Sequence, residues 1–362
     1  MRGLTRADHP ERGAVAIIVA LVAVILFGIA AWVIDGSALR QERRELQNGA
    51  DAAALAIAQD CAVGNCDNAA ATAQPYLDQN ATSDSRTALQ PNGITYPASN
   101  QVRVAVQTFD AAPGGGSDGD ADTVDFVFAP VLGQDGSPVT AEATAQWSAA
   151  GGGGAIPIII SDCEWRDATA NGSNYASPPF DGLGQTIHFL DPSGNNGNGN
   201  GDDDGDGDGD ASDVVGSCDY RPGHDAFDGS EPLPGGFGWL ESSDCEAEVL
   251  LDEWIGANPG NGPPSDCDLD SLLGTTVMIP VFDDFAPDGG PPGCGPGGKC
   301  YHVLGYAAFH LTGYRFPGRQ SSPPPCGPPL TCISGHMTQF VFGPATGGGG
   351  TDLGAKAIWL VG

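Results

Sequence analysis

Basic side chains are scarce in this sequence. Of 362 residues, 46 are acidic and 14 are basic, and Lys299 and Lys356 are the only two lysines. Six of the basic residues lie within the first 44 positions, so the remainder is even more acidic than the net charge of −32 indicates. Such a surface repels nucleic-acid phosphates and anionic lipid head groups. The composition therefore predicts no nucleic-acid partner.

Several catalytic motifs are also missing. The sequence contains no HExxH, no GxxxxGK[S/T] and no CxxC, the patterns of zinc proteases, phosphate-binding loops and thiol redox centres. His302 and His310 share parity within an expected strand, where they could face one side. Two histidines on a strand are far more often packing or surface residues than a site. We therefore expect no enzymatic activity, no catalytic residues, and no cofactor other than the calcium considered below.

Ionisable side chains are absent from residues 14–34. At about 1.5 Å per residue this run makes a helix of roughly 31 Å, enough to cross a bilayer once. The sequence has no proline between Pro10 and Pro75, so the helix is expected to continue past the apolar run. A cleavable signal has a shorter apolar core, and a helix of a soluble protein usually has a polar face, which residues 14–34 lack. A retained transmembrane anchor is therefore the favoured interpretation.

Charge and cysteine together predict the orientation of this anchor. Three arginines precede it and three follow it, which leaves the charge rule indecisive. All ten cysteines follow the anchor, and their even number fits disulfides in an oxidising compartment. We expect a cytoplasmic tail (1–13), a transmembrane helix (14–34) and an extracytoplasmic bulk in a single-pass protein of the cell membrane.

The segment 35–150 is expected to form a helix followed by a small antiparallel sheet. Its helix has a mostly apolar stripe that should pack against another element of the chain: Leu39, Arg43, Leu46, Ala50, Ala53 and Ile57. Cys61 and Cys66 are expected to pair with each other. Strands are predicted by alternating patterns at 101–107, 123–129 and 139–147. Gly151 to Gly154 then form a linker.

The segment 151–362 is expected to be a cysteine-rich, mostly β domain, which makes the whole chain α+β. Strands are predicted at 156–160, 275–282, 301–316, 337–342 and 357–361. The pattern PPxCGPxxxC occurs twice, ending at Cys300 and Cys332, and indicates two similar loops, each closed by its own disulfide. Zinc is the competing interpretation, although CxxC pairs and suitably spaced histidines are missing.

Residues 202–213, DDDGDGDGDASD, carry the strongest ligand-binding pattern, within an acidic loop at 194–213. Six aspartates fall at positions 1, 3, 5, 7, 9 and 12 of a calcium loop: Asp202, Asp204, Asp206, Asp208, Asp210 and Asp213. Gly207 takes the sharp turn, whereas position 12 is Asp where an EF-hand has Glu. The spacing also resembles the repeats of thrombospondin type 3. A solvated acidic spacer is the competing interpretation, because Gly and Asn precede the loop and no helix flanks it.

The N-terminal region resembles the TadE/TadG-like Flp pilus-assembly proteins over about 50 residues. The residues that carry the resemblance are Arg12-Gly13 before the apolar helix, Asp35 just after it, and Leu46 to Leu55 (LQNGADAAAL). The stretch to about residue 150 is similar to the region after this helix in that family, and the cysteine-rich part resembles extensions of actinobacterial members. The resemblance implies a pilin-like, single-pass, non-catalytic protein of a tight-adherence pilus system. Class IV prepilins carry Glu five residues after the cleaved glycine, but Gly13 is followed there by Ile18, which favours a permanently anchored accessory protein.

Two further hypotheses use the same anchor differently. The exterior part would be a calcium-dependent surface adhesin or ligand-binding module in one, and an extracytoplasmic enzyme in the other. The expected partners of the favoured hypothesis are the lipid bilayer and pilus or cell-envelope proteins.

Overall fold

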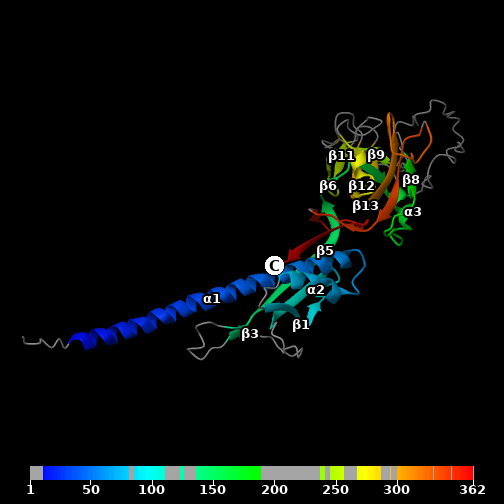
Figure 1. Cartoon of the computed structure of the whole chain (residues 1–362). Helices are drawn as coiled ribbons and strands as arrows, with labels where there is room; N and C mark the ends of the chain where they lie inside the picture. Colours follow the sequence, from blue (N-terminus) through cyan, green and yellow to red (C-terminus); the bar gives the residue numbers. More distant parts are fainter. Residues whose placement is uncertain are drawn as a thin grey trace, which may run out of the picture. The chain divides into compact units, whose positions relative to one another are not determined.

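The chain divides into two compact units, which we describe separately. The first comprises Met1–Ile57, Cys66–Ala145 and Leu360–Gly362, and the second comprises Ala58–Asn65 and Gln146–Trp359. The computed structural model (Figure 1) describes residues 11–80, 85–110, 123–125, 136–188, 237–240, 245–256, 267–286, 294, 300–328, 330–343 and 345–361.

The chain begins with a 52-residue helix, α1 (Glu11–Ala62), which is continuous in Figure 1. Its Ala- and Leu-rich sequence has high helix propensity and contains no proline. Four residues of the predicted stripe, Leu46, Ala50, Ala53 and Ile57, are fully buried. The expectation that this half of the helix packs within the chain is therefore confirmed.

The predicted stripe is wrong at Arg43, which is exposed. Glu42 occupies the buried line instead and is 9% exposed. Arg43 lies about 60° from Leu46 around the helix axis and on the same side as Ala50, seven residues later. Its long side chain keeps the guanidinium in water, where the charge is better solvated.

A second helix, α2 (Ala69–Gln79), follows a turn. It lies close to α1, because a Cβ built at Gly49 would be 3.5 Å from Asn80 Cβ and 3.6 Å from Leu77 Cδ2. The same position is 3.8 Å from Thr87 Cγ2 on the first strand. Sequence analysis made no prediction for α2, which contains Pro75.

The sheet of the first unit places β2 (Gln101–Asp110) between β1 (Ser85–Thr95) and β5 (Thr140–Gly152). β1 and β2 run antiparallel. A separate antiparallel pair joins β3 (Thr123–Asp125) and β4 (Gly136–Pro138). The strands predicted at 101–107 and 139–147 are confirmed, whereas the prediction for 123–129 is confirmed to Asp125 and continues outside the described residues.

The second unit is built on an eight-stranded sheet whose main path has the order β8-β15-β13-β12-β7-β9. Its longest strand, β13, runs antiparallel to both neighbours, and β12 runs parallel to β7. The strands of the path are β7 (Ile158–Ser161), β8 (Gln185–His188), β9 (Phe237–Trp239), β12 (Thr276–Ala286), β13 (Cys300–Phe316) and β15 (Cys332–Thr338). The mostly β character of this region is confirmed.

Short elements complete this unit. β11 (Trp254–Gly256) and β14 (Arg319–Gln320) pair with β13, β10 (Ala247–Glu248) pairs with β6 (Gly154–Ala155), and β16 (Phe340–Val341) runs parallel to β18 (Ala355–Val361). β17 (Thr346–Gly347) pairs with the end of β5. The helical pieces are α3 (Asp162–Thr169) and the 3₁₀ helix η3 (Leu269–Leu272).

Both faces of the large sheet are buried. Alternate residues of β7 enter different clusters: Ile158 and Ile160 enter the cluster that contains Trp165 of α3, and Ile159 enters the other. The first turn of α3 is capped by the Ser161 hydroxyl, which accepts a hydrogen bond from the Glu164 backbone N–H at 3.2 Å. A strand buried on both faces reads as a continuous apolar run, as IPIII does here.

A bulge in β13 reverses its alternation. In its pairing with β12, this strand has one extra residue, Leu304, between the paired residues on either side. As a result, Tyr301 and Val303 before the bulge pack into the same cluster as Tyr306 and Ala308 after it. Residues of equal parity on the two sides of Leu304 therefore point to opposite faces.

Disulfides close the loops between these strands. The two predicted loop bridges, Cys294–Cys300 and Cys326–Cys332, are both present. A third bridge, Cys245–Cys267, joins the segment before β10 to the segment before η3. Cys61, Cys66 and Cys163 are also disulfide-bonded. The predicted pairing of Cys61 with Cys66 stays a prediction, because the bonding partner of each is not among the described contacts.

Candidate functional site

The N-terminal half of α1 presents apolar side chains all around the helix. The large apolar residues from Val15 to Ile34 are exposed, with Phe27 at 68% and Trp32 at 77%. A soluble protein rarely exposes an apolar surface of this extent, whereas hydrocarbon solvates it well. In the described part of the chain, α1 is the one helix long and apolar enough to cross a membrane.

The environment of α1 changes at Asp35. This carboxylate is 6% exposed, and Glu42, two turns later, is 9% exposed. Residues seven apart lie on the same side of a helix, and this side continues into the buried line of Leu46 and Ala53. The helix therefore has an apolar exposed half and a half that packs on one face and meets water on the other.

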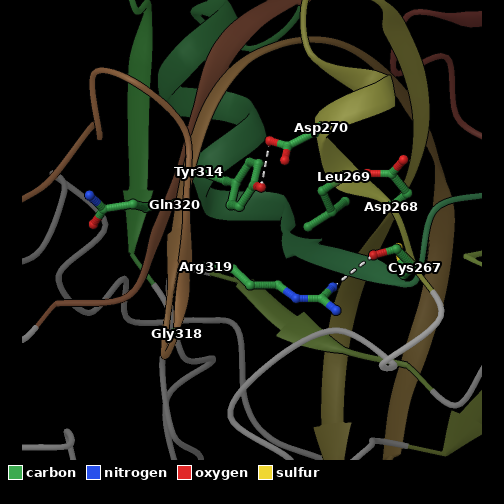
Figure 2. A pocket seen from close by; sticks show the side chains of 8 residues that line it. All are labelled: Cys267, Asp268, Leu269, Asp270, Tyr314, Gly318, Arg319 and Gln320. Atoms are coloured by element: carbon green, nitrogen blue, oxygen red, sulfur yellow. Dashed lines mark hydrogen bonds between the residues drawn. The ribbon is translucent and has the colours of Figure 1, made fainter.

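A groove of about 610 Å³ in the second unit lies between η3 and the β13–β14 turn (Figure 2). Tyr314 donates its hydroxyl to Asp270 Oδ1 at 2.7 Å, and Arg319 donates to the Cys267 carbonyl at 3.0 Å. Burial, helped by the Asp270 contact, raises the pKa of Tyr314 to about 12, so this phenol is neutral at physiological pH. These two hydrogen bonds hold η3 against β13 and its turn, so the polar groups of the groove have a structural role.

The two histidines considered as a pair lie apart. The bulge at Leu304 places His302 and His310 on opposite faces of the sheet, so the shared side that their parity allowed is not formed. His302 Nδ1 is 2.6 Å from Asp283 Oδ1. His310 is stacked on Phe180 with ring centroids 4.0 Å apart.

His310 has a different histidine neighbour, His336, which lies directly across from it on β15. The Nδ1 atom of His310 is 3.3 Å from the Thr276 hydroxyl oxygen. Burial, and secondarily His336, lowers the pKa of His310, so the ring is neutral at physiological pH. Phe180 also lies near His336, with centroids 5.7 Å apart. Phe180, His310 and His336 therefore form a cluster of packed side chains.

Comparison with known proteins bears on α1. Residues 13–60 match the Tad family model, Flp pilus-assembly TadE/G-like. The match spans α1 from its apolar half to the end of its packed half. No curated protein and no solved structure matches the chain. The resemblance found in the sequence is thus confirmed for this N-terminal segment.

Within the TadE/G-like segment, the run LQNGADAAAL is a packing motif. Ala53 and Ala54 are fully buried. Gly49 has no side chain, which lets α2 and β1 approach the helix. Gln47 donates its side-chain amide to Asp51 Oδ1 at 2.8 Å and to the Glu142 carbonyl at 3.0 Å. Small residues here let the helix lie close to its neighbours, and the amide connects it to β5.

The calcium prediction falls outside the described residues. Its six aspartates are Asp202, Asp204, Asp206, Asp208, Asp210 and Asp213, and it stays a prediction. Elsewhere, in the ranges that the structure describes, no group of three or more His, Cys, Asp or Glu is placed to hold a metal ion. Calorimetric titration of the full chain with calcium, against Asp202→Asn/Asp204→Asn/Asp206→Asn, tests it.

Sequence reasoning missed two arrangements. The contact of Gln47 with Glu142 joins residues 95 apart, and no local pattern indicates it. The Tyr314–Asp270 bond joins residues 44 apart and depends on the turn after β13. The residue that local signals could have identified is Gly49, since a glycine in the middle of an otherwise good helix usually marks a close approach.

Proposed function

We propose that this chain is a permanently anchored, non-catalytic accessory protein of a Flp pilus-assembly system. Its α1 helix would cross the membrane once with the N-terminus in the cytoplasm, and the part of the chain after residue 34 would lie outside the membrane. The observation that carries this proposal is the coincidence of the TadE/G-like match at 13–60 with the helix that is apolar in one half and packed in the other.

Disulfide bonding supports an extracytoplasmic position for the part after the anchor. Each described cysteine is disulfide-bonded, and disulfides persist in oxidising compartments. The same part is strongly acidic, which disfavours nucleic-acid partners. A non-catalytic role is supported by the hydrogen bonds of Tyr314 to Asp270 and of Arg319 to Cys267, which use the polar groups of the groove to hold the fold together.

The anchor and its orientation are tested in cells that express the full chain with a C-terminal tag. We expect the protein to resist extraction from membranes by alkaline carbonate. Protease added to intact spheroplasts should remove the tag, and a membrane-impermeant maleimide should label cysteines only after reduction. Recovery in the soluble fraction, or a tag protected until lysis, would contradict this topology.

The pilus role needs a separate test. Deletion should lower the number of Flp pili on the cell surface, and the wild-type chain should restore it. A matched chain in which an unrelated transmembrane helix replaces residues 13–34 keeps the packed half of α1 and reports whether the span only anchors. A deletion with normal pili, and with surface binding that calcium chelation abolishes, would favour the adhesin alternative instead.

A further inference from the structure

Three arginines follow the apolar half of α1 at short distance. Arg40, Arg43 and Arg44 lie six to ten residues beyond Ile34 on the continuous helix, and all three are exposed. At about 1.5 Å per residue they are roughly 9 to 15 Å past the last apolar residue along the axis. This is the region where a spanning helix leaves the head-group layer.

The three arginines share one side of the helix. At about 100° per residue they fall within an arc of roughly 100°, which begins about 60° from Leu46 at Arg43 and extends from there to the side opposite Glu42. In the described part of the chain, none of the three has an ion pair or side-chain hydrogen bond. The three arginines therefore form a solvated basic surface that makes no ion pair with any residue that the structure describes.

The side chains of the three arginines extend toward the half of α1 that is suited to the bilayer. Side chains of an α-helix tilt toward its N-terminus, and the N-terminal half of α1 is the half suited to lipid. An arginine side chain extends several ångströms, and its guanidinium snorkels to phosphate depth along an apolar surface. Trp32, 77% exposed, lies where aromatic residues anchor a helix at the interface.

We propose that Arg40, Arg43 and Arg44 bind the phosphates of anionic phospholipids in the leaflet from which the packed half of α1 emerges. Guanidinium groups form paired hydrogen bonds with phosphate oxygens, and each basic residue near an anionic surface adds to the attraction. The acidic remainder of the chain repels the same lipids. Contact with anionic lipid is therefore restricted to the stretch of α1 that carries the three arginines. The inference rests on the proposed anchoring.

Quenching of Trp32 fluorescence by brominated lipids measures this preference. The full chain is reconstituted into phosphatidylcholine bilayers that contain brominated phosphatidylglycerol or brominated phosphatidylcholine. Trp32→Phe gives the background of the other tryptophans. We expect the wild type to favour phosphatidylglycerol roughly fivefold. Arg40→Gln/Arg43→Gln/Arg44→Gln should reduce the ratio to about one.

Two matched variants and a competitor sharpen the test. Arg40→Lys/Arg43→Lys/Arg44→Lys should keep most of the preference, and Gln41→Ala/Asn48→Ala, on the same stretch of helix, should leave it unchanged. Inorganic phosphate at equal concentration should not abolish it, since the site is a lipid surface. Equal quenching by both lipids in the wild type, or a full preference in the Gln variant, would overturn the inference. Absence of quenching by either lipid would instead contradict the anchor itself.

Discussion

The side-chain amide of Gln47 donates a hydrogen bond to the carbonyl oxygen of Glu142, with 3.0 Å between Nε2 and O. The same amide also donates to Asp51 Oδ1 at 2.8 Å, so it is held in place one turn along the helix. This contact connects the packed half of α1 to β5 within the first unit. The TadE/G-like segment thus has, beside a half that is apolar enough to cross a membrane, a half that contacts the sheet next to it.

Replacing Gln47 with alanine should loosen this connection. A partly exposed hydrogen bond contributes about 1 kcal/mol, equal to roughly fivefold in an opening equilibrium. Hydrogen exchange measured by mass spectrometry should therefore quicken about fivefold in peptides covering residues 140–145. Asn48→Ala, at an exposed neighbouring position, serves as the control. Unchanged protection in Gln47→Ala would show that the contact does not hold the strand.

Charges in the middle of the apolar run should abolish membrane retention. Val24→Lys/Leu26→Lys places two ammonium groups near its centre, and each costs about 2.5–3.5 kcal/mol on membrane-insertion scales. We expect the variant to move to the carbonate-soluble fraction or to be degraded. Gln41→Lys/Asn48→Lys adds the same charge beyond the run and should stay in the membrane. Equal retention of both double variants would argue that α1 does not cross the bilayer.

The parts of the fold that sequence predicted are those with a strong local pattern. Residues 14–34 identify an apolar helix without any knowledge of neighbours, and QVRVAVQ alternates as β2 does. The two PPxCGPxxxC loops allowed short-range bridges, and the structure has both. In each case the determining interactions lie within about ten residues.

The parts that sequence did not predict depend on distant partners. The bulge at Leu304 lies in the pairing of β13 with β12, a strand about 20 residues earlier in the chain, and it changes which face His310 occupies relative to His302. The helix α3 has only eight residues, too short to show a clear period, and is fixed by Trp165, whose Nε1 donates to the Leu353 carbonyl at 2.9 Å.

Removing the Cys245–Cys267 bridge should destabilise the second unit. The bridge closes a loop with a sequence separation of 22 residues, for which chain entropy gives about 3 kcal/mol. Cys245→Ala/Cys267→Ala should lower the urea midpoint of this unit, followed by tryptophan fluorescence. Cys294→Ala/Cys300→Ala opens a separation of only six and should cost less. A larger effect of the shorter loop would show that packing, rather than loop closure, determines the order.

Alkaline pH should destabilise the second unit through its buried phenols. Tyr306 is 1% exposed and donates its hydroxyl to the Val249 carbonyl at 2.6 Å. Burial, with a smaller contribution from Glu253, raises the pKa of Tyr306 to about 12, above its ordinary value of 10.0. Between these values the folded state binds more protons than the unfolded state, so the free energy of unfolding falls as the pH rises through this window. Below pH 10 the protonated Tyr306 makes its full contribution to the free energy of unfolding.

The variant Tyr306→Phe separates this titration from the rest of the fold. Losing the hydrogen bond should lower the unfolding free energy by about 1–2 kcal/mol at pH 8. The further loss between pH 10 and 11 should be shallower than in the wild type, because only Tyr175 and Tyr314 then keep a raised pKa of about 12. Urea unfolding at both pH values measures the two effects, with Tyr76→Phe as control, because Tyr76 is 40% exposed. Parallel pH dependences in Tyr306→Phe and wild type would mean that this phenol does not contribute to the alkaline loss of stability.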